Sequence, residues 1–423
     1  MIMERLALLA PVPVALLVGL AFFLQAFSRP LLGGHKSQHR TESKESEPGS
    51  VQGDHENAVS KESDFPQDWW TSSNVFELER RAIFSKKWMY LTHRSRFSKA
   101  GDYHSFEVAG IPIFLVLGKD GIVRAFHNVC RHRAYTITRK ECGSSMVLGC
   151  RYHGWSYNTH GQLIKAPHFD NVQGFDKSQN GLFSIHATTT HTGFVFVNLD
   201  ACPAVIPVET IPLDSFASRH GIGQQSTWLG GQAIEGQFNW KLGLRFQRFI
   251  DIHEHKLPQT KYKVLSSRLF NHPPMCAEDI RVFPFATFHT IGDAALWYSL
   301  SFVPMSETRT SVRFDLYSHG ERCGLRSSAM QDDLSSRLNT SIQALEIEFQ
   351  SYSGNPMYVP NPRDAQRAIL DILKSHSKLE KQTGAEVFPA TRKPRRNARF
   401  ERAEQLCKDL DCQDTWNRKS LAW

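Results

Sequence analysis

Hydrophobic and polar positions divide the chain into an apolar start, a polar linker and a long patterned body. Residues 6–27 contain no charged side chain. At about 1.5 Å per residue, a helix of this length crosses a hydrocarbon core of about 30 Å. The run is longer than the apolar region of a usual signal peptide, and no clean small-residue cleavage site follows it. We expect a single-pass membrane anchor over residues 1–34, with a cleaved signal peptide as the alternative.

Charged residues beside the apolar run orient this expected anchor. Arg29, Lys36 and Arg40 follow the run, whereas Glu4 offsets Arg5 before it. Because positive flanks favour the cytoplasmic side, the pattern predicts a membrane protein whose body faces the cytoplasm.

Polar segments precede and follow the body. Residues 35–64 are mixed in charge and have few large apolar side chains, so they cannot bury enough surface to offset their chain entropy. We expect a disordered tether there and a basic tail over residues 391–423. The formal charge of +8 is diffuse and is densest at residues 391–400. Nucleic-acid binding would need basic and aromatic side chains interleaved on a folded face, so no nucleic-acid partner is expected.

Helical apolar spacing opens the body, and short strands follow it. Residues 75–91 predict a helix that ends in a strand, and residues 102–110, 111–118 and 122–129 predict three strands separated by Gly and Asp turns. The last two form a hairpin with Lys-Asp-Gly at its tip. The pattern predicts a small antiparallel β-domain over residues 65–212.

A second domain is expected over residues 213–390. Its strand candidates precede two amphipathic helices near residues 328–350 and 362–382. The candidate strands are 261–270, 279–291, 296–305 and 309–318. The fold class is therefore α+β, with an antiparallel sheet and a long C-terminal helix.

Two cysteine–histidine pairs carry the candidate chemistry. Cys130-x-His132 is followed, after seventeen residues, by Cys150-x-x-His153. This is the ligand spacing of a Rieske [2Fe–2S] centre, in which two thiolates hold one iron and two imidazoles hold the other. Neutral imidazoles raise the potential to roughly −150 to +300 mV, so such a centre passes single electrons. Structural zinc is the alternative, since mixed Cys/His sites often bind zinc.

The remaining cysteines show no regular disulfide spacing, and thiolate ligands together with scattered free cysteines favour a reducing compartment. These six residues are Cys142, Cys202, Cys276, Cys323, Cys407 and Cys412.

Residues 65–200 closely resemble the Rieske domain of Rieske-type non-haem iron oxygenases. The matching text is WTSSNVFELERRAIFSKKW, AFHNVCRHRAY, CRYHGWSYNTHGQL and GFVFVNLDA. The resemblance extends to choline-monooxygenase-like and other aromatic-ring-hydroxylating-type enzymes of fungi. It implies a helix-grip catalytic domain, a mononuclear Fe(II) on two histidines and one carboxylate, and open positions for O₂ beside a small-molecule substrate. It also implies an NAD(P)H-dependent reductase or ferredoxin as electron donor, and a homotrimer.

The chain departs from that family where the catalytic iron should bind. The family signature starts Asn-Trp-Lys, present here at residues 239–242 as NWKL, and continues to a His-x4-His pair that is missing. Asp251-x-His253-x-His255 remains as a candidate, with Asp251 as a possible bridge between the two centres. In an extended strand all three side chains point to one face, whereas in a helix the two histidines lie about 200° apart.

The family takes its carboxylate ligand from a later helix. Glu346 borders the apolar face of the helix expected at residues 328–350 and is a better candidate than Glu348. Ordinary solvated roles are the alternative for Glu346 and for the two histidines.

Two explanations fit the missing histidine pair. Residues 243–260 are either an altered translation, as from a misjudged splice junction, or the mark of a protein that lost its mononuclear iron. The leading hypothesis is a membrane-tethered Rieske-type oxygenase that oxidises a small, lipophilic organic substrate. The alternative is a Rieske electron carrier or a catalytically impaired paralogue.

Overall fold

The computed structural model describes six stretches of the chain, which are residues 65–169, 172–244, 279–291, 295–319, 327–353 and 364–387. The chain divides into two compact units, Met1–Lys61 and Glu62–Trp423, and every described residue lies in the second. In these stretches no helix is both long and apolar enough for a membrane span. The expected anchor, tether and basic tail lie outside the described residues and stay predictions.

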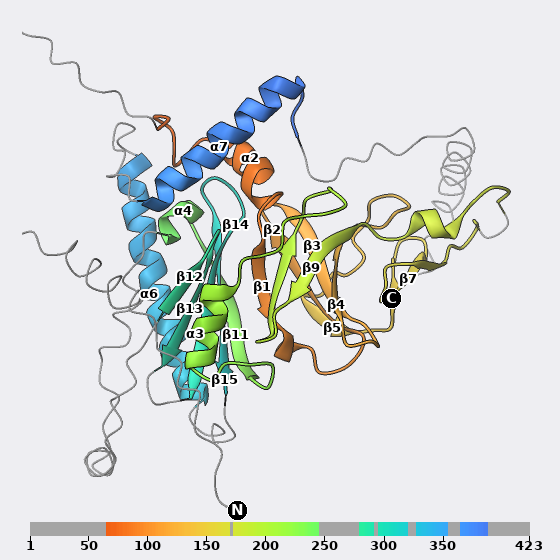
Figure 1. Ribbon diagram of the computed structural model, residues 1–423, viewed down its shortest axis with the longest axis horizontal. Helices are drawn as coiled ribbons and strands as arrows, with labels where there is room; N and C mark the ends of the chain where they lie inside the picture. The colour runs from red at the N-terminus through yellow and green to blue at the C-terminus, as the bar shows by residue number, and fades with distance from the viewer. Residues whose placement is uncertain are drawn as a thin grey trace, which may run out of the picture. The chain divides into compact units, whose positions relative to one another are not determined.

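A seven-stranded antiparallel sheet forms the first part of the body (Figure 1). Its strands are, in sheet order, β1 (Met89–His93), β10 (Phe194–Asn198), β9 (Ser184–Thr189), β4 (Val123–His127), β3 (Ile111–Leu117), β2 (Asp102–Val108) and β5 (Cys142–Ser144). The predicted β3–β4 hairpin is confirmed, since the Gly118 N–H donates to the Ile122 carbonyl over 2.9 Å. Gly121 sits in the turn with a φ of 77°, which favours glycine.

A separate three-stranded sheet is formed by the strands that come between β5 and β9 in the sequence. These are β6 (Val147–Gly149), β7 (Ser156–Asn158) and β8 (Leu163–Lys165). The turn between β7 and β8 contains Gly161, at a φ of 78°. A side chain there would approach the Phe126 ring to 2.3 Å, so the close approach requires glycine. Phe126 belongs to a hydrophobic core of its own that surrounds the two cysteine–histidine pairs.

The remaining sheet has five antiparallel strands, in the order β11 (Thr227–Gly236), β15 (Thr310–Ser318), β14 (Leu296–Pro304), β13 (Ala286–Ile291) and β12 (Asp279–Val282). The single strand expected over residues 279–291 is wrong, because a turn divides it and Val282 pairs with Ala286. Pro284 lies in this turn, where its missing N–H removes no ladder hydrogen bond. Candidate strand 261–270 lies outside the described residues.

Two long helices, α6 (Ser327–Ser353) and α7 (Asp364–Thr383), confirm the amphipathic helices expected from the sequence. The apolar face of α6 is buried, and the helix contacts β11. Figure 1 shows it running along the five-stranded sheet. Its buried side chains recur every three or four residues, at Leu334, Leu338, Ile342, Leu345 and Phe349. The mixed α+β class with antiparallel sheets is therefore confirmed.

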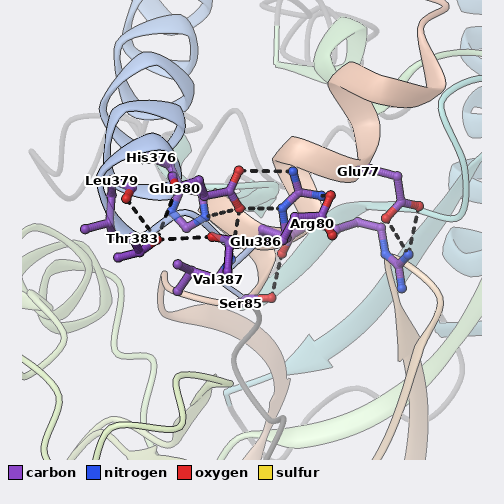
Figure 2. Close-up of polar contacts among 11 residues, drawn as sticks. Glu77, Arg80, Ser85, His376, Leu379, Glu380, Thr383, Glu386 and Val387 are labelled. Atoms are coloured by element: carbon purple, nitrogen blue, oxygen red, sulfur yellow. Dashed lines mark hydrogen bonds and ion pairs between the residues drawn. The ribbon is translucent and has the colours of Figure 1, made fainter.

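Helix α7 packs against a different part of the chain, the N-terminal helix α2 (Ser73–Glu79) and the π-helical turn η1 (Arg80–Phe84). Glu380 of α7 accepts two hydrogen bonds from Arg81, at 2.6 and 3.2 Å, and lies 3.2 Å from His376 Nε2 (Figure 2). On the neighbouring turn, Arg80 pairs with Glu77 at 2.8 Å. These contacts join the end of α7 to the start of the body.

The short helix α4 (Trp240–Gly243) begins at the Asn-Trp-Lys motif and is tied to the same N-terminal segment. Lys241 Nζ donates to Glu79 over 2.5 Å, and Trp240 Nε1 donates to the other Glu79 oxygen over 2.7 Å. Asn239 and Lys241 donate to backbone carbonyls of the Trp69–Trp70 pair over 3.0 and 2.8 Å. Burial lowers the pKa of Lys241, and the adjacent Glu79 carboxylate opposes that shift.

One hydrophobic core unites the two predicted domains. Phe84 lies 5.1 Å from Trp240, and Tyr90 lies 4.7 Å from Phe288, both measured between ring centroids. This core contains residues from both sides of the domain boundary that the sequence predicts near residue 213. The boundary itself stays a prediction.

The Lys241–Glu79 pair predicts a large effect on stability. Lys241→Met leaves the Glu79 carboxylate buried and uncompensated, which should lower the free energy of unfolding by about 3–5 kcal/mol. The matched control Arg309→Met removes the exposed Arg309–Glu235 pair and should cost less than about 1 kcal/mol. Denaturant titration followed by circular dichroism measures both. Equal losses in the two variants would contradict the role given to the buried pair.

Candidate metal centre

The first cysteine–histidine pair lies on a tight loop after β4. The Cys130 N–H donates to the Tyr135 carbonyl over 2.7 Å, and the Ala134 N–H donates to the Cys130 carbonyl over 3.0 Å. Ala134 is in the left-handed region, with a φ of 54°. This conformation folds the loop back so that Cys130 and His132 share one side of it.

The second pair, between β6 and β7, repeats this geometry. The Cys150 N–H donates to the Trp155 carbonyl over 2.7 Å, and the Gly154 N–H donates to the Cys150 carbonyl over 2.9 Å. Gly154 has a φ of 71° and stands four residues after its cysteine, as Ala134 does. Two loops with the same hydrogen bonds therefore present the two pairs.

The four predicted cluster ligands come together. The Cys130 and Cys150 thiols are within hydrogen-bond reach of each other, and both residues are only 3% exposed. The imidazole rings of His132 and His153 have centroids 4.6 Å apart. The thiols thus form one half of the site and the imidazoles the other, as a [2Fe–2S] cluster with two thiolates on one iron and two imidazoles on the other requires.

Burial and mutual contacts shift the pKa values of these groups in different directions. The hydrogen bond with Cys130 lowers the pKa of Cys150 to about 6, and the same bond, together with burial, raises the pKa of Cys130. Burial, with smaller contributions from His153 and Arg133, lowers the pKa of His132 to about 4. His132 is therefore neutral near pH 7, which is the form of imidazole that binds metals.

Aromatic side chains enclose the site. The His132 ring stacks on Trp155 at 5.0 Å, and Tyr152 lies 3.9 Å from His153 between ring centroids. Tyr157 Oη lies 3.3 Å from Cys130 Sγ and accepts the Arg131 N–H over 3.1 Å. Hydrogen bonds to ligand sulfurs tune the potential of iron–sulfur clusters, so Tyr157 is placed to tune this one.

Tyr157 is a functional residue that sequence reasoning missed, although a signal was present. Trp155 lies directly before β7 and Tyr157 lies within it, and alternate residues of an extended chain face the same side. Trp155 is separated from the second pair by Gly154 alone, so the same period extends the site to Tyr157. The Trp155 indole N–H is buried with no hydrogen-bond acceptor in the described residues.

The candidates for the mononuclear iron are only partly described. Asp251, His253 and His255 lie outside the described residues. Glu346 is half-buried on α6, where its Oε1 accepts the Gln237 N–H over 2.8 Å. In the described stretches, no three His, Cys, Asp or Glu side chains gather around one ion. The assignments to this iron stay predictions.

Comparison with known proteins agrees with the cluster site. Residues 87–176 match the family model of the Rieske [2Fe-2S] domain. The carnitine monooxygenase oxygenase subunit of Acinetobacter pittii is 38% identical over 136 residues, 32% of this chain and 36% of that protein. The glycine betaine monooxygenase oxygenase subunit of Chromohalobacter salexigens is 32% identical over 197 residues, 47% of this chain and 42% of that one. The chain spans well under half the length of these curated relatives.

Solved structures extend the likeness in fold to about three quarters of the chain. The quaternary ammonium Rieske monooxygenase CntA in complex with L-carnitine is 20% identical, with a TM-score of 0.58 over 74% of this chain and 94% of that chain. Naphthalene 1,2-dioxygenase from Rhodococcus sp. is 16% identical, with a TM-score of 0.51 over 75% and 94%.

The chain thus contains a Rieske [2Fe–2S] domain within a Rieske-oxygenase fold. The predicted kinship with Rieske-type oxygenases and the predicted [2Fe–2S] cofactor are confirmed, and the relatives are named oxygenases, which are oxidoreductases. These relatives give no support to the fungal affinity.

The two equivalent loops carry alanine in one case and glycine in the other at the left-handed position. Exchanging each residue for the other type should change the stability of the protein in opposite directions. Ala134→Gly should stabilise the protein by about 0.5–1 kcal/mol, because relief of left-handed strain exceeds the entropy cost of glycine. Gly154→Ala should destabilise it by about 1 kcal/mol or more, since the new Cβ would lie 3.3 Å from Pro167 Cγ. Thermal unfolding of both variants measures the effect. A shift of the same sign in both would contradict the equivalence of the loops.

Proposed function

We propose that this protein is the oxygenase component of a Rieske-type oxygenase system. Cys130, His132, Cys150 and His153 would hold a [2Fe–2S] cluster, which supplies single electrons for O₂ activation at a mononuclear iron and oxidation of a small organic substrate. The observation that carries the proposal is the convergence of the two equivalent loops. The second, sheet-and-helix half is far more than an electron carrier requires.

The catalytic iron would be held by His253, His255 and Glu346, with Asp251 as the bridge between the centres. Two contacts support this assignment. The buried Asn239–Lys241 motif fixes the backbone just before the segment that contains the histidines. The hydrogen bond from the Gln237 N–H to Glu346 holds the carboxylate of α6 against the backbone two residues before Asn239.

Substrate class is proposed from the relatives, which are named for carnitine and glycine betaine or, like anthranilate 1,2-dioxygenase, for an aromatic acid. A quaternary ammonium or an aromatic molecule is therefore the proposed substrate. The aromatic side chains of β13 and β14 fill the core. Phe288, Trp297 and Tyr298 are at most 1% exposed, and Trp297 stacks on Tyr317 at 4.1 Å.

The proposed electron donor is an NAD(P)H-dependent reductase or a ferredoxin with an acidic surface. Support comes from Arg139, Lys140 and Arg151, which are exposed and close in sequence to the ligands. Opposite charges on two partners speed their encounter. We further propose a homotrimer tethered to a membrane by the N-terminal anchor, with its body in the cytoplasm.

A single-turnover experiment tests this function without a reductase. The full chain is reduced chemically and mixed with O₂ and with L-carnitine, glycine betaine or anthranilate. At least one substrate should give up to about one oxidised product per chain as the cluster is reoxidised. His153→Ala should abolish the product by removing a cluster ligand, whereas His160→Ala, on an exposed turn, should not.

Reoxidation of the cluster without product from any of these substrates would contradict the proposed oxygenase and favour the electron carrier. Equal product from His153→Ala would contradict the cluster assignment.

A further inference from the structure

A groove unrelated to the cluster lies between α2 and α7. Its volume is about 610 Å³, and its floor is apolar, formed by Phe65, Trp69, Leu78 and Leu373. Phe65, Trp69 and Leu373 are at most 6% exposed, so they underlie the groove, and its accessible apolar surface comes from the exposed Pro66 and the half-buried Val75 and Leu78. A volume of this size falls within the range of small-molecule sites.

One rim of the groove is basic. Lys374, Lys378 and Lys381 stand four and three residues apart on α7, which places them on one face of the helix. All three are exposed, and none forms an ion pair within the described part of the chain. Two acidic residues of α7 near the lysines are paired with arginines, Asp371 with Arg367 and Glu380 with Arg81. The lysine row therefore presents unneutralised positive charge along an apolar floor.

The floor of the groove is held rigidly. The Trp69 indole N–H donates to Gln366 over 3.0 Å, and the Trp69 carbonyl accepts a hydrogen bond from Lys241 over 2.8 Å. Both contacts are buried, and they join the segment that precedes α2 to α4 and α7. A site formed before its ligand arrives spends little binding energy on ordering side chains.

We propose that this groove binds a monomeric medium-chain carboxylate, with the alkyl chain on the apolar floor and the carboxylate beside the lysine row. Charge complementarity assigns the anionic head, because the cations lie on one rim only. The buried floor favours a single alkyl chain as the ligand. A membrane surface is the less suitable ligand, because apolar side chains that do not protrude cannot insert into a bilayer. Lysine suits this role, as its flexible stem adapts a point charge to the head group.

Displacement of a fluorescent fatty-acid analogue by decanoate, kept below its micelle concentration, tests the proposal on the full chain. One decanoate should bind per chain, and decanol should bind at least tenfold more weakly. Ser377→Trp, which fills the groove, should abolish binding. Lys374→Gln/Lys378→Gln should weaken binding about tenfold, while the equally charged control Lys99→Gln/Lys119→Gln, at exposed sites elsewhere, should leave it unchanged.

Any of four results would overturn the proposal. The first two are equal affinity for decanol and decanoate, and unchanged decanoate binding by the Ser377→Trp variant. The third is equal weakening of decanoate binding in the two double-lysine variants. The fourth is a protein that binds vesicles containing acidic phospholipid but does not bind decanoate. The lysine variants lie on the surface, so they keep the test decisive if Ser377→Trp fails to fold.

Discussion

The buried ion pair between Lys241 and Glu79 is the constraint on which the rest of the structure depends. Its side chains are 1% and 0% exposed and come from positions 162 residues apart in the sequence. A charge buried without its partner is strongly destabilising, so α2 and α4 can meet only in this register. Gln366 of α7 then donates to the Lys241 carbonyl over 3.1 Å, which adds the C-terminal helix to the same junction.

This junction connects the cluster to the remainder of the protein. Helix α2 continues through η1 into β1, which pairs with β10 in the seven-stranded sheet. That sheet also contains β4, from which the first cluster loop departs. The small core around the cluster site is separate from the main core. The cluster loops therefore depend for their position on the seven-stranded sheet, which the buried pair connects to the rest of the protein.

The sequence was most informative where chemistry or periodicity is local. Cysteine–histidine spacing predicted the four side chains that the two loops bring together, and apolar spacing predicted α6 and α7. Strand β11 was missed because it contains three glycines and buries only two of its ten residues, so its sequence lacks a regular alternation of apolar and polar side chains. The role of Lys241 was also missed, since a lysine normally indicates solvent exposure and its partner lies far away in the sequence.

The most direct test of the account is the content of iron and acid-labile sulfide in the purified full chain. An oxygenase with both centres should contain about three irons and two sulfides per chain, and His253→Ala should lower the iron to about two without changing the cluster absorption. About two irons and two sulfides in the parent chain would contradict the catalytic iron. Iron without labile sulfide would contradict the Rieske cluster itself.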